Sequence, residues 1–213
     1  MNWLGFQRKE STETGAGSSA IDIPLFPLGG VLFPGGVLSL KVFEQRYLDM
    51  TAGCMKDKTP FGVCLISSGK EVGESAVPHK VGTLAHIDKA DMPQLGILML
   101  TVRGGRRFRI ISTTTRPDGL LRAQVELLAE PARQDVPAAQ QGLLPLLQKV
   151  AGDLGPEKMP EPHVFDDAAW VGYRLTEIVP VQALAKQKLL ELDDPLSRLQ
   201  ILHTYLAQRK LVV

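Results

Sequence analysis

An apolar stretch broken by prolines and glycines constrains the fold of this chain more than any other feature: IDIPLFPLGGVLFPGGVLSLKVF, at residues 21–43. Three prolines and four glycines divide it into short apolar runs. Proline removes a backbone donor and clashes with the preceding turn of a helix, so no helix can pass through prolines at this density. The stretch therefore predicts short strands joined by turns.

Further strands are predicted between residues 61 and 130. Compact apolar runs bounded by turn residues follow one another there: FGVCLI, VGTLAHI, GILMLTV, RRFRII and RAQVELLAE. Runs of this length and composition indicate an antiparallel β-barrel or a strongly curved sheet. The pair Gly104 and Gly105 predicts a two-residue hairpin turn, because both central positions of such a turn need positive φ.

Helices are predicted mainly in the carboxyl half. One short helix precedes them, since Phe43, Tyr47, Met50 and Cys54 recur on one helical face. Beyond Pro131 the apolar period changes from 2 towards 3.6, and a helix is expected within residues 181–192. Three further helices are expected. The first has Asp135 as its N-cap, and Pro145 should kink it or shift its start; the second has Asp166 or Asp167 as its N-cap. The third begins at Asp194 as the N-cap, followed by Pro195.

The chain is therefore expected to have an α+β fold. An antiparallel β pseudo-barrel is predicted over residues 21–131 and a small α-helical bundle over residues 132–213, after a mobile tail at residues 1–20. Cys54 and Cys64 lack metal or disulfide spacing and are predicted to be buried thiols. With neither a signal peptide nor a stretch of ~18 apolar residues, the protein is expected in the cytoplasm and not in a membrane.

Several motifs resemble those of the Lon protease N-terminal (substrate-binding) domain family. They are the opening run PLFPLGGVLFPGGVLSLKVFEQRY, then FGVCLI, VGTLAHI, VRGGRRFRI, AQVELLAEP and KQKLLELDDPLSRLQIL, in the order of the family. The resemblance extends over almost all of residues 21–206, and Gln45 stands where many relatives have proline. It implies that the pseudo-barrel is PUA-like and is followed by a helical subdomain.

The resemblance implies a non-catalytic module that binds unfolded or exposed polypeptide segments and serves a protease or chaperone machine. The chain has no GxxxxGK[ST] loop, so we expect a stand-alone family member without ATPase or peptidase modules and without a cofactor. The oligomeric state is left open. One alternative is an RNA-binding protein, because PUA-like barrels also bind RNA. The other is a small hydrolase with an unrecognised dyad.

The sequence offers little catalytic chemistry. His79, His86, His163 and His203 are widely separated and predict neither a metal site nor a general base. Ser67, Ser68 and Lys70 have the composition of an ordinary turn, and a lysine base would have to be buried. We therefore expect no catalytic residue and no metal ligand.

Two polar clusters are the candidate binding residues. The first is Phe43, Glu44, Arg46 and Tyr47, where Glu44 and Arg46 are expected to pair with each other or with buried backbone, although ligand contact is the alternative. The second is Arg106, Arg107 and Phe108, expected either to form a solvated hairpin tip or to bind phosphate and stack on a base. With 24 basic and 23 acidic residues, RNA binding would depend on this local patch.

Overall fold

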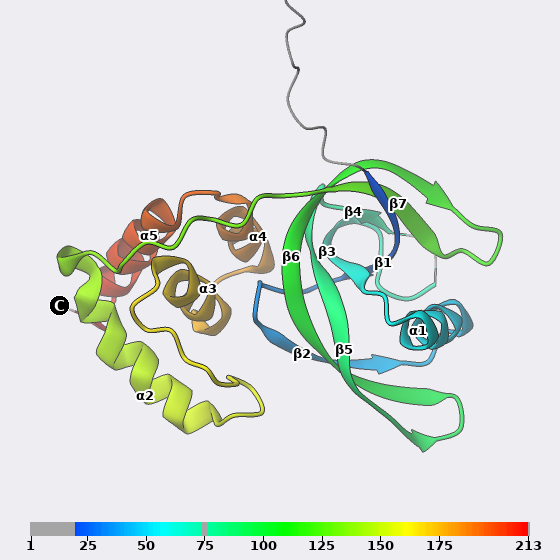
Figure 1. The fold of residues 1–213 in the computed structure, drawn as a ribbon, viewed down its shortest axis with the longest axis horizontal. Helices are drawn as coiled ribbons and strands as arrows, with labels where there is room; N and C mark the ends of the chain where they lie inside the picture. The colour runs from blue at the N-terminus through cyan, green and yellow to red at the C-terminus, as the bar shows by residue number, and fades with distance from the viewer. Residues whose placement is uncertain (1–19, 74–75, 213) are drawn as a thin grey trace, which may run out of the picture.

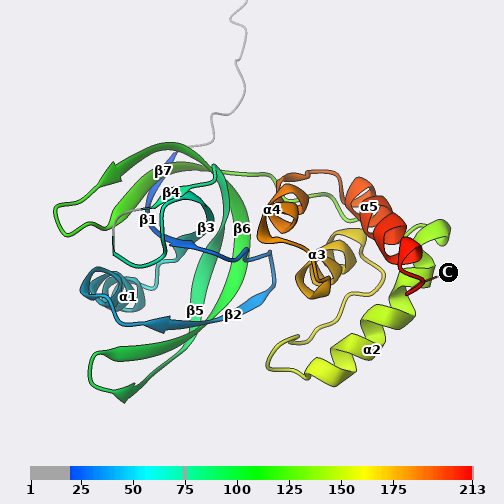
Figure 2. The same cartoon turned by 180° about the vertical axis from the view of Figure 1, so that it is seen from behind.

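The computed structural model describes residues 20–73 and 76–212 and places a β-barrel beside a group of helices (Figure 1). The view from behind shows the same two parts side by side (Figure 2). The elements in chain order are β1 (Ile21–Leu28), β2 (Val37–Val42), α1 (Gln45–Asp57), β3 (Phe61–Ser68), β4 (Val77–Pro78), β5 (Val81–Gln94), β6 (Ile97–Thr115), β7 (Leu121–Leu127), η1 (Ala138–Leu143), α2 (Leu144–Leu154), α3 (Ala168–Ile178), α4 (Ala183–Glu191) and α5 (Pro195–Gln208).

The barrel closes because β1 pairs with two strands. Its residues 21–24 run antiparallel to β7, and its residues 25–28 run parallel to β3. With the order β7-β6-β5-β3 between them, this double pairing completes a ring. Strand β2 lies outside the ring and pairs only with β6, among the described residues. The expected antiparallel pseudo-barrel is therefore present, with one parallel pair at its closure.

The predicted hairpin at Gly104 and Gly105 is wrong. Both glycines lie inside β6, which is continuous from Ile97 to Thr115, and the turn before it contains Gly96 at φ +80°. A Cβ on Gly104 would clash with the carbonyl oxygen of Phe33, and one on Gly105 would lie 2.7 Å from Nε2 of His86. These positions need glycine for close approach of neighbouring atoms and not for a turn.

The helix predictions were partly confirmed. Asp167 and Asp194 cap α3 and α5 through side-chain acceptors, and Pro145 lies in the first turn of α2. Asp135 is not an N-cap: it forms an isolated β-bridge with Asp167, and a 3₁₀ helix precedes α2. Phe43 lies before α1 and is 49% exposed, so it does not share the buried face of that helix.

Each part has its own apolar core. Buried residues of β1, β2, β5, β6 and α1 fill the barrel, and those of α2, α3 and α5 form the helical core. Phe33 and Val81 from the barrel side pack with Ala169, Tyr173 and Leu190 of the helices, which joins the two cores. Both cysteines are buried and unpaired, as predicted.

The predicted boundaries stay predictions. The boundary at residue 131 falls between β7 and η1, and the expected tail, apart from residue 20, lies outside the described residues. None of the helices that the structure describes is long and apolar enough to cross a bilayer.

The two glycine environments give a testable prediction. Gly104→Ala should lower the free energy of unfolding by about 3 kcal/mol or more, because its Cβ meets backbone atoms that cannot move aside. Gly152→Ala, in helix α2 with nothing within 4 Å of the added Cβ, should instead raise it by about 0.5–1 kcal/mol. Urea denaturation of both variants checks this, and equal effects would contradict the role given to Gly104.

Candidate functional site

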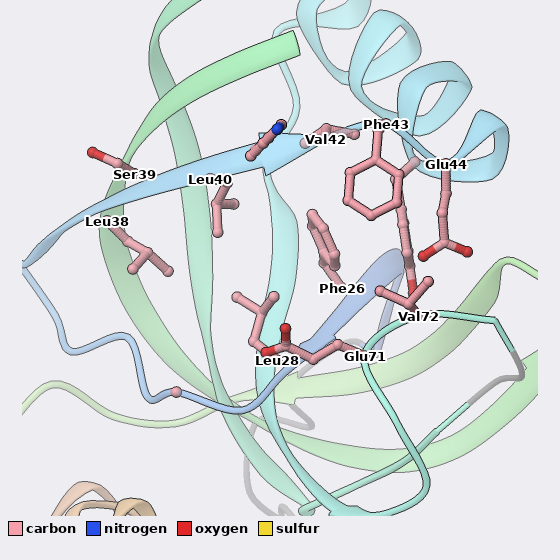
Figure 3. A pocket seen from close by; sticks show the side chains of 13 residues that line it. Phe26, Leu28, Leu38, Ser39, Leu40, Val42, Phe43, Glu44, Glu71 and Val72 are labelled. Carbon is pink, nitrogen blue, oxygen red and sulfur yellow. The ribbon is translucent and has the colours of Figure 1, made fainter. Parts of the chain in front are cut away.

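A groove beside β2 is the first candidate site (Figure 3). It encloses about 360 Å³. Most of its walls are apolar and come from β1, β2, the start of α1 and the segment after β3. The lining residues are Phe26, Leu28, Gly30, Leu38, Ser39, Leu40, Lys41, Val42, Phe43, Glu44, Tyr47, Glu71 and Val72.

Three of the predicted binding residues, Phe43, Glu44 and Tyr47, line this groove. Phe43 and Val72 are exposed at its mouth, whereas Tyr47 is buried and stacks on Phe26 with ring centroids 4.1 Å apart. Burial raises the pKa of the Tyr47 phenol, with a further rise from the carboxylates of Glu44 and Glu71 that the guanidinium of Arg46 opposes. The groove therefore has a neutral aromatic floor.

Arg46 does not line the groove, but it pairs with the groove residue Glu44. Its guanidinium forms an ion pair with Glu44 at 3.0 Å and donates a hydrogen bond to the carbonyl oxygen of Gly119 at 3.0 Å. Glu44 also accepts from the backbone N–H of Gly73 at 3.4 Å. The expected pairing of Glu44 with Arg46 and with the backbone is confirmed.

A second carboxylate lies at the same edge. Glu71 accepts a hydrogen bond from the backbone N–H of Gly29, and among the described residues it has no basic partner within ion-pair distance. Glu44 and Glu71 thus place negative charge beside apolar walls. The lining also contains one basic residue, Lys41, so it is the carboxylate of Glu71, which has no basic partner, that favours a basic group on an otherwise apolar ligand.

A larger cavity lies where the barrel meets the helices. It encloses about 610 Å³, and only Lys158, Glu177 and Lys186 of its lining residues carry charge. Its apolar lining residues are Val31, Leu32, Val37, Leu38, Leu146, Val150, Leu154, Met159, Leu175, Ile178, Val179, Pro180, Leu206 and Leu211. Leu38 lines this cavity and the groove beside β2, so the two hollows adjoin along β2.

Glu177 is the acidic residue among those that line this cavity. It pairs with Arg174 at 3.0 Å, and Arg174 also donates to the carbonyl oxygen of Pro34 at 2.7 Å. Although 24% of the Glu177 side chain is exposed, its carboxylate packs so closely on Gly36 that a Cβ there would clash with Oε1. This burial raises the pKa of Glu177 to about 7, against the opposing effect of Arg174 and Lys186.

The arginine cluster has a different role from the one predicted. Arg107 is 3% exposed and Phe108 is completely buried, so neither is available to bind phosphate or stack on a base. Arg107 donates to the carbonyl oxygens of Leu190 and Leu192 at 2.8 and 3.1 Å and pairs with Asp193 at 2.8 Å. Arg107 connects β6 with the end of α4 through these bonds, a contact called the strut below, and it is not part of a hairpin tip.

Arg106 alone of that cluster is accessible. It is 44% exposed and donates to the carbonyl oxygen of Leu128 at 3.0 Å.

The candidate catalytic turn is exposed. Ser67, Ser68 and Lys70 are all exposed, so the burial that a lysine base needs is missing. In residues 20–73 and 76–212 no three His, Cys, Asp or Glu side chains are grouped so as to hold a metal ion.

Comparison with known proteins gave consistent matches. Residues 22–208 match the family model of the ATP-dependent protease La (LON) substrate-binding domain. Lon protease 2 of Herpetosiphon aurantiacus is 27% identical over 203 residues, which are 90% of this chain and 24% of that protein. The chain thus spans about a quarter of the length of this relative.

Two solved structures are similar to the chain. The crystal structure of a Lon N-terminal domain protein from Xanthomonas campestris has a TM-score of 0.73 and 35% identity, covering 87% of this chain and 98% of that one. The N-terminal domain of Mycobacterium avium complex Lon protease has a TM-score of 0.60 and 17% identity, covering 88% and 98%. At 17% identity the second likeness shows the fold alone, and together they confirm the predicted α+β fold class.

The strut gives a testable prediction. Arg107→Ala should lower the free energy of unfolding by about 2–3 kcal/mol, because it leaves the carbonyl of Leu190 without this donor and removes one of the two arginine donors to the carbonyl of Leu192. Arg103→Ala is the control on the same strand: its ion pair with Asp88 is exposed, and its loss should cost about 1 kcal/mol or less. Chemical denaturation of both variants is the measurement, and equal costs would refute the strut.

Glu177 gives a prediction on pH. Because its folded-state pKa is about 7 and its ordinary value 4.5, the folded protein binds more protons than the unfolded chain between these values. The free energy of unfolding should therefore fall as the pH rises through this window, by up to about 1.4 kcal/mol per pH unit. Glu177→Gln should flatten this slope in urea titrations, whereas Glu130→Gln, at a 74% exposed carboxylate, should keep it. A slope unchanged by Glu177→Gln would contradict the assignment.

Proposed function

Because the chain belongs to the ATP-dependent protease La (LON) substrate-binding domain family, we propose that it is a non-catalytic module that binds exposed apolar segments of polypeptides. The observation that carries this proposal is the apolar surface formed by the two adjoining hollows on either side of Leu38. Concave, mostly apolar sites with a few charged groups are typical of ligand binding. A surface of this kind suits unfolded chains, which expose side chains that folded proteins bury.

The predicted contact residues take two roles in this proposal. Phe43, Glu44 and Tyr47 line the groove beside β2 and are proposed to touch the polypeptide. Arg46 is a positioning residue, since it is 7% exposed, does not line the groove and pairs with Glu44. Arg106, Arg107 and Phe108 line neither of the two hollows.

We further propose that the protein acts without ATPase or peptidase chemistry of its own, in the cytoplasm, and that it presents polypeptides to a separate protease or chaperone machine. Two findings support this. The match is to a binding domain, and it accounts for residues 22–208 of the chain. The candidate catalytic turn at Ser67, Ser68 and Lys70 is exposed and lies outside both hollows.

A binding measurement tests the function. Reduced, carboxymethylated α-lactalbumin, fluorescently labelled, should bind saturably, and binding should persist when the salt concentration is raised, because apolar burial is not screened by ions. Labelled single-stranded RNA is the competitor. RNA binding that weakens steeply with salt would instead favour the nucleic-acid alternative, and absence of polypeptide binding would overturn the proposal.

Leu38 provides the matched variant. Leu38→Ser should weaken polypeptide binding by about tenfold, because this half-buried side chain lines both hollows and its loss removes about 1–2 kcal/mol of apolar contact. Leu184→Ser removes a leucine that is 53% exposed on α4 and lines neither hollow, and its affinity should stay at that of the wild type. Circular dichroism checks that both variants are folded, and an equal loss in both would contradict the site.

A further inference from the structure

Strand β2 has an unpaired edge beside the groove. It pairs with β6 from Val37↔Arg103 to Val42↔Leu98, without a register shift. In the part of the chain that the structure describes, no other strand pairs with β2. One edge of β2 therefore carries backbone donors and acceptors that no neighbouring strand uses, which is the arrangement to which an extended peptide can add.

The register shows which backbone groups face outward. Gly104 donates its N–H to the carbonyl oxygen of Gly36 at 2.8 Å, and this pair continues the β2–β6 register. Hydrogen-bonded pairs alternate along an antiparallel ladder, so Leu38, Leu40 and Val42 bond to β6. The N–H and C=O groups of Ser39 and Lys41 then point away from β6, along the free edge.

The groove lies along this free edge. Figure 3 shows Leu38 and Leu40 on the side of β2 that faces Phe26 and Leu28, with Ser39 on the other side. Across the gap from β2, Leu28 and the segment at Glu71 and Val72 form the opposite wall. A strand added to β2 would thus have apolar side chains of the barrel on one of its faces.

The charges in the groove indicate which kind of peptide fits it. Glu44 and Glu71 place two carboxylates in its lining beside one basic residue, Lys41. Glu44 is paired with Arg46, whereas Glu71 has no basic partner within ion-pair distance among the described residues. Phe43 and Val72, 49% and 54% exposed, add apolar surface at the mouth. Apolar residues at alternate positions and a flanking basic residue match these walls.

We propose that the polypeptide binds here as an extra β-strand, hydrogen-bonded through its backbone to Ser39 and Lys41 on the free edge of β2. Its alternate apolar residues face Phe26 and Leu28. A basic residue of the polypeptide lies near Glu44 and Glu71. This inference rests on the proposed function and specifies its ligand. The backbone pairing makes binding tolerant of sequence, as a protein that receives many unfolded chains requires, and the alternation of side chains sets its preference.

Methylated peptides test the backbone pairing on the wild-type protein. The probe is the labelled heptapeptide acetyl-Lys-Val-Thr-Val-Thr-Val-Lys-amide. Methylation of the backbone nitrogens at the three valines, or separately at the two threonines, blocks donors on one edge of an extended chain at a time. We expect one of the two methylated peptides to lose affinity by about tenfold or more while the other binds like the parent.

A variant of β2 tests the same contact from the protein side. Ser39→Pro removes the outward N–H and leaves the β6 ladder intact, since proline is tolerated on an edge strand where its nitrogen faces outward. It should weaken heptapeptide binding by about tenfold, whereas Ser39→Ala, which keeps the N–H, should bind like the wild type. If Ser39→Pro fails to fold, the methylated peptides decide.

The outcomes separate this inference from the proposed function. If the unfolded α-lactalbumin binds but the two methylated peptides bind equally well, and Ser39→Pro equals Ser39→Ala, strand addition is wrong and the binding function stands. If the α-lactalbumin does not bind at all, both proposals fall. Selective loss with one methylated peptide and with Ser39→Pro supports strand addition at β2.

Discussion

The arrangement of the two halves depends on buried arginines that satisfy the open end of helix α4. The last carbonyls of any helix lack partners within the helix, and at α4 they point into the junction. Arg107 from the barrel donates to the carbonyls of Leu190 and Leu192, and Arg198 from α5 donates to those of Leu189, at 2.9 Å, and Leu192. Three elements meet at one helix end, so the barrel and the helices are held at a fixed angle, and the junction cavity keeps its shape.

Local chemistry made much of this fold predictable. Prolines exclude helix, aspartates cap it and apolar periods distinguish strand from helix, which accounts for β1, β3, α3 and α5. The failures at Gly104 and Arg107 have a common cause. Gly104 is required because the carbonyl of Phe33 lies where a Cβ would be, and Arg107 is buried because it donates to carbonyls more than 80 residues away in the chain. No local sequence pattern encodes those partners. Local sequence alone therefore predicts a turn at Gly104 and a solvated hairpin tip at Arg107.

The candidate site divides in the same way. Phe43, Glu44 and Tyr47 were predicted from a motif contiguous in sequence, and they lie together in the groove. Glu71 and Val72 reach it from the segment after β3, and Leu38 belongs to two hollows at once. Ordinary strand and loop residues of this kind carry no chemical signature, because an apolar wall is recognised only when distant segments are brought together. The family resemblance identifies the motif that contains Phe43, Glu44 and Tyr47, whereas the opposite wall of the groove is visible only in the structure.

Closure of the barrel explains why β2 keeps a free edge. The double pairing of β1 removes free edges from the ring, since each strand of the ring has neighbours on both sides. Strand β2 is excluded from that ring and is anchored by β6 alone. Its short length and the exposed Lys41 limit uncontrolled pairing with other sheets, which are the usual protections of an edge strand. Its position between the groove and the junction cavity places this edge beside mostly apolar walls, so a chain paired to it would also bury apolar side chains.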